Sequence, residues 1–203
     1  FFKVNEFNKK EKQILNYITK NFKIIAIRSS AFDEDQSNKM LAGKYKSFLK
    51  IDAKNSDLVK EKINKVINSY KRKNNHDEIL IQEYVKKAKI ICVASTTGEN
   101  NTPYYVINYK NSKKTDIITT QSISPSSFVF YRFSKIKPRN KIFNLIINFL
   151  DNLILITKEP SLDVEFIIDE SNKINLIQVR KIKRNKKKKT KKFYDFYING
   201  LEK

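Results

Sequence analysis

Four polar side chains fall at alternating positions of two neighbouring apolar segments, a spacing that could build a site for a metal ion and a phosphate. They are Asp163 and Glu165 in the first segment, and Gln178 and Arg180 in the second. Residues two apart in a β-strand point to the same face. The polar run 169–173 (DESNK) between the segments has the composition of a tight turn. We therefore expect a hairpin that gathers all four groups on one face.

The chemistry of this set suits a magnesium–nucleotide complex. Carboxylate and amide oxygens are hard ligands of the kind Mg²⁺ prefers, and Asp163, Glu165 and Gln178 offer such oxygens. Arg180 would supply a cation for phosphate. A cross-strand salt bridge on an exposed sheet face explains the same residue types equally well, and the pattern alone does not separate the two.

A second cation, Arg28, directly follows the apolar segment 23–27, which is predicted to be a strand. With the hydroxyl groups of Ser29 and Ser30 after it, a guanidinium at a strand end could hold phosphate oxygens. The alternative is a surface arginine in a turn. The acidic run 33–35 (DED) is typical of a solvated loop, and His76 is given no catalytic role.

Several enzyme classes lack support in this sequence. No Walker A, paired zinc-ligand, GxSxG or GxGxxG pattern is present, and the chain has only three glycines. P-loop kinases, zinc enzymes, hydrolases with a nucleophile elbow and Rossmann oxidoreductases are therefore not indicated.

Charge and length set further limits. The 203 residues carry a formal net charge of +21, and nine basic residues lie within 181–192, so 21 minus 9 leaves +12 for the rest. We predict a domain over 1–180 and a basic linker or tail over 181–203. A nucleic-acid or anionic-surface binder acting through 181–192 is the alternative function, because clustered cations gain affinity from counterion release.

The hydrophobic pattern predicts an α+β fold. Helices are expected over 9–22, from an N-cap at Ser56 to about residue 70, and over 140–157, because apolar residues recur there at helical spacing. Short apolar segments separated by polar turns predict a largely antiparallel sheet, with strands at 79–85, 90–94, 104–109, 116–120 and 128–133. We expect two lobes, approximately 1–78 and 79–180.

The expected location is the cytoplasm. The one cysteine, Cys92, lies in an apolar run and has no cysteine partner within the chain. No uncharged apolar stretch is long enough to span a bilayer. The N-terminus lacks the plan of a signal peptide and looks like a cut end.

Four segments, in order, resemble the ATP-binding, ATP-grasp-type domain of the phosphoenolpyruvate synthase and pyruvate phosphate dikinase family. The opening motif is similar to 25–31 (IAIRSSA) followed by 41–49 (LAGKYKSFL). The strand that leads into the adenine pocket resembles 79–85 (ILIQEYV). The closing metal–phosphate hairpin resembles 162–166 (LDVEF) with 176–180 (LIQVR).

The resemblance implies ATP and Mg²⁺ as cofactors and a role for each candidate residue. Arg28 would contact the transferred phosphoryl group beside Ser29, and Glu165 and Gln178 would hold magnesium or phosphate, supported by Asp163 and Arg180. The adenine would be held by Gln82, Glu83, Tyr84 and Val85, partly through their backbone. The catalytic candidates are therefore Arg28, Glu165 and Arg180.

The implied activity is that of an ATP-dependent phosphotransferase, a kinase that is incomplete without the family's phosphohistidine and acceptor-binding domains. The segment 103–109 (PYYVINY) with Thr115 and Asp116 is more similar to the glutamine-kinase-like branch of surface-polysaccharide pathways. The family's Gly-rich stretch and its early phosphate-binding lysine have no counterpart, and Cys92 stands where glycine is usual. A degenerate, non-catalytic ATP-grasp domain is therefore a further alternative.

Overall fold

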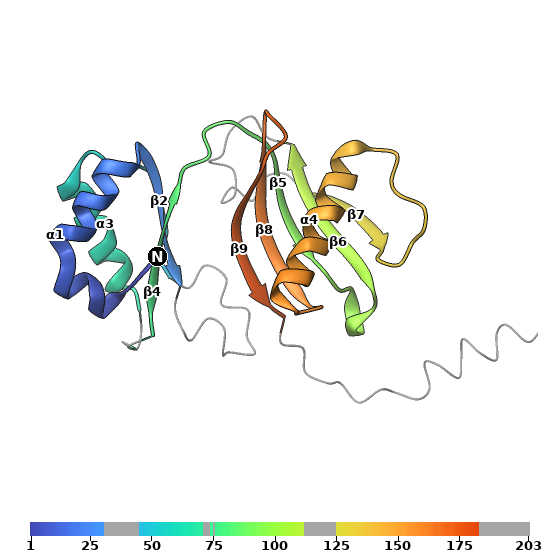
Figure 1. Cartoon of the computed structure of the whole chain (residues 1–203), viewed down its shortest axis with the longest axis horizontal. Coiled ribbons are helices and arrows are strands. Elements are labelled where there is room, and N and C mark those ends of the chain that lie inside the picture. Colours follow the sequence, from blue (N-terminus) through green and yellow to red (C-terminus); the bar gives the residue numbers. More distant parts are fainter. Residues whose placement is uncertain (31–44, 71–73, 75, 112–124, 183–203) are drawn as a thin grey trace, which may run out of the picture.

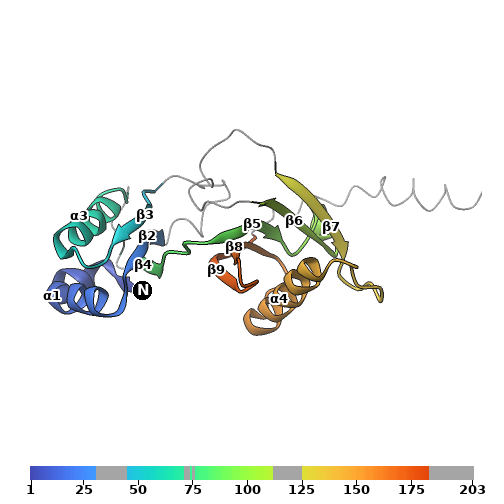
Figure 2. The ribbon, with the colours of Figure 1, turned by 90° about the horizontal axis from the view of Figure 1, so that it is seen from above.

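The computed structural model describes residues 1–30, 45–70, 74, 76–111 and 125–182. These residues form two antiparallel sheets, each with helices on one face, and the sheets lie side by side in the molecule (Figures 1 and 2). The predicted α+β class with largely antiparallel sheets and flanking helices is confirmed.

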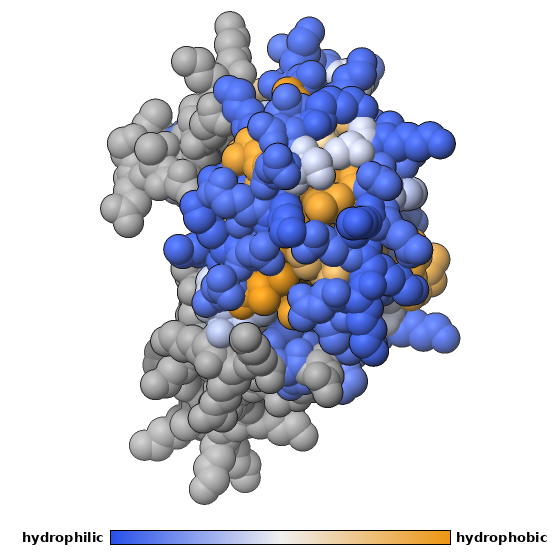
Figure 3. All heavy atoms as spheres, turned by 90° about the vertical axis from the view of Figure 1, so that its left-hand side faces the viewer, coloured by the Kyte–Doolittle hydropathy of each residue, from blue (hydrophilic) through white to orange (hydrophobic). Residues whose placement is uncertain are grey.

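The first sheet has the strand order β1-β4-β2-β3. Its strands are β1 (Phe2–Lys3), β2 (Ile24–Ser30), β3 (Phe48–Asp52) and β4 (Glu78–Glu83). Helices α1 (Val4–Asn21) and α3 (Ser56–Ile67) pack on the same side of it (Figure 1). Their outward surface is mostly hydrophilic (Figure 3), as expected of amphipathic helices whose apolar residues enter the core.

Two details of the first sheet differ from the prediction. Strand β4 pairs with β1 and β2, so the boundary between the sheets falls in the connection 84–87 and not at 78/79. The N-cap of α3 is Asn55, whose side chain accepts a hydrogen bond of 2.9 Å from the Leu58 amide, and Ser56 is the first helical residue. Both residue types are good caps, and the sequence does not distinguish neighbouring ones.

The second sheet has the strand order β7-β6-β5-β8-β9. Its strands are β5 (Ala88–Ser95), β6 (Tyr104–Asn111), β7 (Ser126–Tyr131), β8 (Leu162–Asp169) and β9 (Ile174–Lys181). A short 3-10 helix, η1 (Glu99–Asn101), precedes β6, and helix α4 (Lys141–Thr157) covers one face. The predicted strand 116–120 lies outside the described residues.

The core of the second sheet lies between its strands and α4. On β8, Val164, Phe166 and Ile168 are buried in this core, and Phe166 meets Phe149 of α4 edge to face with ring centroids 5.2 Å apart. Because side chains alternate along a strand, Asp163, Glu165 and Ile167 point to the opposite face. Among the helices of the described ranges, none combines the length and apolar composition needed to cross a bilayer.

Candidate functional site

The β8–β9 hairpin brings the four predicted polar residues together. Asp163 pairs with Arg180, and Glu165 pairs with Gln178, on the sheet face opposite α4. All four side chains are partly exposed. The turn is held by Asp169, whose carboxylate accepts hydrogen bonds from the Ser171 amide at 2.9 Å and the Lys173 amide at 3.0 Å. The hairpin predicted from the turn composition is therefore present.

A β-bulge in this hairpin adds an apolar group to the same face. The register shifts between Glu165 and Phe166, so that Ile177 lies between residues paired with successive positions of β8. Ile177 is buried with Ala88 and Ile167 in a small cluster, against which Val85 and Ile91 also pack. Sequence reasoning missed this apolar cluster, although Ile167 and Ile91 share the site face by strand alternation.

Burial and charge act against each other on Asp163. Burial raises the pKa of its carboxyl group above the ordinary value, and the positive charge of Arg180 lowers it to a smaller extent. A bound cation would favour the ionised carboxylate in the same way as Arg180 does. Asp163 is thus a carboxylate whose charge is incompletely compensated by its neighbours.

Arg28 extends from β2 toward this hairpin. It pairs with Leu80 of β4 and lies on the face of the first sheet that is opposite the buried Ile25 and Ile27. Burial lowers the pKa of the Arg28 guanidinium, and the negative charge of Glu165 partly restores it. Arg28 of β2 and Glu165 of β8 therefore interact as opposite charges across the junction of the two sheets.

Gln82 connects the two sheets directly. Its amide nitrogen donates to the backbone oxygens of Leu176 at 3.3 Å and Ile177 at 3.2 Å in β9. Gln82 lies two positions from Leu80 on β4, so it shares a face with Arg28. The predicted adenine-strand residue and the predicted phosphate-binding residue thus both face the second sheet.

Among the described residues, two at the junction each have a buried polar atom for which the structure shows no hydrogen-bond partner. These atoms are Nε of Arg28, a donor, and Oε1 of Gln82, an acceptor. Such atoms cost free energy unless a partner is supplied, and most buried polar atoms have one. Two such atoms on the face that meets the second sheet fit a polar ligand at this junction.

The remaining predicted site residues are placed less favourably. Strand alternation puts Ser29 with Ile27 on the helix-covered face, away from Arg28, because β2 continues to Ser30. Glu83 is exposed at the end of β4. Tyr84 and Val85 lie in the connection between the sheets, where the Tyr84 amide donates to the Ile24 oxygen at 2.9 Å.

Other predictions fall outside this junction or outside the described residues. His76 is exposed in the turn before β4, where its amide donates to the Asn74 side chain at 3.0 Å. The acidic run 33–35, Gly43, Thr115 with Asp116, and nearly all of the basic run 181–192 lie outside the described residues. The same is true of most of the motif 41–49, of which residues 45–49 are described.

The donor set fits magnesium only together with a ligand. Within the described ranges, no group of three or more His, Cys, Asp or Glu side chains is arranged to hold a metal ion. Asp163, Glu165 and Gln178 offer oxygens from neighbouring positions of two strands. Mg²⁺ in nucleotide enzymes is commonly bound by one or two carboxylates plus phosphate oxygens and water, so the residues present are compatible with that mode.

The junction of this α+β fold thus combines cations and carboxylates from two sheets with a small apolar cluster. Residues 4–96 match the family described as pyruvate phosphate dikinase, AMP/ATP-binding domain. The resemblance predicted from the motifs is thus confirmed over this part of the chain, which contains Arg28 and the segment 82–85 but not the β8–β9 hairpin.

Comparisons with individual proteins give weaker similarity than the match to the family. A solved structure of N5-carboxyaminoimidazole synthetase from Staphylococcus aureus complexed with ADP matches with 14% identity and a TM-score of 0.32, over 88% of this chain and 44% of that chain. The chain therefore spans less than half the length of that enzyme. A comparison with curated proteins found no match.

Proposed function

We propose that the chain binds Mg-ATP at the junction of its two sheets, and that it is the nucleotide-binding part of a phosphoenolpyruvate-synthase-like phosphotransferase. The single observation that carries the proposal is the electrostatic interaction between Arg28 of β2 and Glu165 of β8 across this junction. The match of residues 4–96 to an AMP/ATP-binding domain supports it independently.

The roles of the residues follow from their positions. Arg28 would hold phosphate oxygens with its guanidinium, and Nε has a hydrogen to donate. Arg180 on β9 would bring a second cation to the phosphates. Phosphoryl transfer depends chiefly on positioning and charge stabilisation, and two cations approaching from different sheets would provide both.

Glu165 and Gln178 would hold the metal, with Asp163 next to them. Bound Mg²⁺ would neutralise phosphate charge and orient the phosphoryl group. The positive charge of the metal would favour the ionised form of Asp163, opposing the burial that raises its pKa. The adenine would lie near Gln82 and Val85, where the free Oε1 of Gln82 can accept a hydrogen bond from an amino group.

The transfer step needs an acceptor that this chain is not proposed to supply. In a complete enzyme, the phosphoryl group would pass to a histidine or directly to an acceptor held by further domains. Cytoplasmic location and the glutamine-kinase-like branch remain parts of this proposal. The alternatives are a non-catalytic domain that has kept the fold and a nucleic-acid binder acting through 181–192.

The test is calorimetric titration of Mg-ATP into the wild-type chain, Glu165→Gln and a matched control, Glu170→Gln. Glu170 lies in the same hairpin but is exposed and pairs with Lys87 at 3.6 Å. We expect measurable binding that Glu165→Gln weakens at least roughly tenfold, because removing one charge-assisted contact costs about 1.5–3 kcal/mol. No binding by folded wild type, or equal weakening by both variants, would contradict the proposal.

A further inference from the structure

Within the part of the chain that the structure describes, the outer edge of strand β7 lacks the usual protection. Edge strands are normally kept from pairing with other chains by charged residues, bulges or short length. In the described part of the chain, the other edge strands have such protection: β1 has only two residues, and β3 contains Lys50 and Asp52 and pairs in an irregular register. Strand β9 carries Arg180 and a β-bulge. By contrast, β7 (Ser126–Tyr131) has no charged residue and pairs with β6 in an unbroken register.

The free side of β7 presents backbone groups in a regular pattern. The Arg132 amide donates to the Pro103 oxygen at 2.9 Å, next to the Tyr104–Tyr131 pair. In an antiparallel ladder, residues bond to the neighbouring strand alternately. The N–H and C=O groups of Val129 therefore point away from β6, and no strand of the described residues pairs with them.

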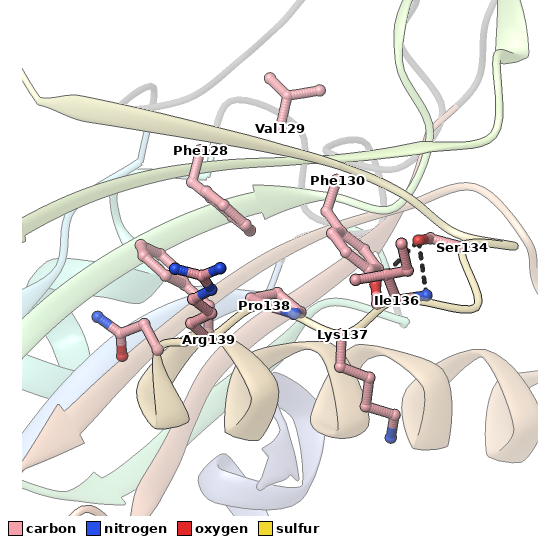
Figure 4. A pocket seen from close by; sticks show the side chains of 10 residues that line it. Phe128, Val129, Phe130, Ser134, Ile136, Lys137, Pro138 and Arg139 are labelled. Atoms are coloured by element: carbon pink, nitrogen blue, oxygen red, sulfur yellow. Dashed lines mark hydrogen bonds between the residues drawn. The ribbon is translucent and has the colours of Figure 1, made fainter.

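An apolar hollow adjoins this edge, between β7 and the start of α4. It has a volume of about 480 Å³, and its floor contains Phe128, Phe130 and Phe143. Phe128 and Phe143 stack with centroids 4.0 Å apart. Figure 4 shows Phe128 and Phe130 pointing into the hollow while Val129 points away from it. The hollow is at the opposite edge of the sheet from β9, so it is separate from the candidate nucleotide site.

The rim of the hollow is positively charged and also apolar. Residues 125–150 contain five basic residues and no acidic residue. Two of the five, Lys137 and Arg139, line the hollow. Ile136, also in the lining, is 81% exposed, and Val129 is 57% exposed. Exposed apolar groups next to unprotected backbone are typical of a binding surface.

We propose that β7 binds an extended segment of a partner protein, in which an apolar residue lies two positions from an Asp or Glu, so that both side chains point to the same face of the added strand. The segment adds as a further strand to the second sheet, so that its backbone bonds to Val129. The apolar side chain enters the hollow over Phe128 and Phe143, and the carboxylate two positions away, on the same face, approaches Lys137 and Arg139. Positive charge favours this acidic partner over a second copy of the chain, because a copy would bring its own Lys137 and Arg139 to the interface.

The proposal is tested by the fluorescence anisotropy of a short labelled peptide, acetylated and amidated, in which Val or Phe lies two positions from Asp or Glu. The full 203-residue chain is titrated into it. A second peptide with Lys in place of the acidic residues tests the charge requirement, and a labelled single-stranded oligonucleotide tests a polyanion. We expect saturable binding of the acidic peptide and binding at least tenfold weaker for the Lys peptide, on the order expected when attraction becomes repulsion.

Two sets of variants locate the binding. Val129→Pro removes the outward N–H, and proline is tolerated on edge strands, whereas Val129→Ala keeps the donor. Lys137→Glu with Arg139→Glu reverses the rim charge, and Lys12→Glu with Lys20→Glu makes the same change on exposed residues of α1. We expect loss of peptide binding with Val129→Pro, and roughly tenfold weaker binding with the rim reversal only. Circular dichroism confirms that each variant is folded.

Hydrogen exchange of the wild type provides a measurement that needs no variant. Peptide addition should slow exchange at the Val129 and Tyr131 amides and leave α1 unchanged, because strand addition protects outward N–H groups. The proposal is overturned if folded wild type does not bind the acidic peptide, or if binding survives both Val129→Pro and the rim reversal. Preferential binding of the oligonucleotide, or self-association that Val129→Pro abolishes, would also overturn it.

Discussion

Replacing Arg28 with methionine should separate binding from stability. The Arg28 guanidinium is largely buried, burial lowers its pKa, and its Nε has no hydrogen-bond partner. The negative charge of Glu165 raises this pKa and so acts against burial. Replacing a buried ion with an apolar side chain of similar length is often neutral or stabilising. We therefore expect the free energy of unfolding of the nucleotide-free chain to stay within about 1 kcal/mol of wild type.

The affinity for Mg-ATP should fall, although the stability of the chain is expected to stay nearly unchanged. A hydrogen bond to a charged group contributes about 1.5–3 kcal/mol. Because 1.4 kcal/mol corresponds to a factor of ten, Arg28→Met should weaken binding roughly tenfold to a hundredfold. Urea unfolding followed by circular dichroism measures stability, and calorimetric titration of Mg-ATP measures affinity on the same preparations.

Arg132→Met is the matched control for this change. Arg132 lies over the rings of Tyr105 and Phe133, at 5.6 and 5.8 Å from their centroids, and its Nη1 donates to the Pro160 oxygen at 3.4 Å. Removing these contacts should cost about 0.5–1 kcal/mol of stability and leave the affinity unchanged. If Arg28→Met bound Mg-ATP as tightly as wild type, or lost affinity only in proportion to unfolded protein, Arg28 would not be a phosphate ligand.

Three further changes test the second sheet. The pKa of Asp169 is lowered from 3.8 to about 2, chiefly by its hydrogen bond from Ser171. This carboxylate therefore stabilises the fold above pH 3.8, and the contribution disappears as the pH falls toward 2. Asp169→Asn should flatten that part of a profile of urea stability against pH, and an unaltered profile would contradict the assignment. Tyr105→Phe removes the hydrogen bond from the Tyr105 hydroxyl to Asp151 of α4 and should lower the free energy of unfolding by about 1 kcal/mol, measured by urea titration. An equally stable variant would show that the bond contributes nothing. Burial raises the pKa of the Cys92 thiol to about 12, so a disulfide reagent at pH 8 should modify it only after urea is added, and rapid labelling of the native chain would refute this burial.

The sequence predicted the β8–β9 hairpin well because its information is local. Asp163, Glu165, Gln178 and Arg180 alternate with buried residues, and a strand period of two assigns each of them to a face without knowledge of the rest of the chain. The turn between the strands carries residues that stabilise it through their own side chains, as Asp169 does. The four-residue set was therefore predictable, although its chemical role remains a prediction.

The placement of β4 and the bulge at Ile177 depended on contacts between distant residues. Gln82 pairs with Ala26, far away in sequence, and no local pattern states which of two sheets a strand will join. Ser29 shows a related difficulty. It was predicted to share the site with Arg28, but consecutive residues point to opposite faces wherever the strand continues. Local patterns thus identified the strands, whereas the composition of the junction required their tertiary pairing.

The unsatisfied atoms at this junction argue that Arg28 and Gln82 act together. Arg28 pairs with Leu80, and Gln82 lies two residues further along β4, so the two side chains are diagonal neighbours on one sheet face. Each leaves one buried polar atom without a partner, Nε as a donor and Oε1 as an acceptor. Leaving such an atom unsatisfied costs about 1–3 kcal/mol, so two of them are a substantial penalty for a domain of ordinary stability. A ligand that accepts from Arg28 and donates to Gln82 would remove both penalties, and a nucleotide carries such groups in its phosphates and its adenine amino group.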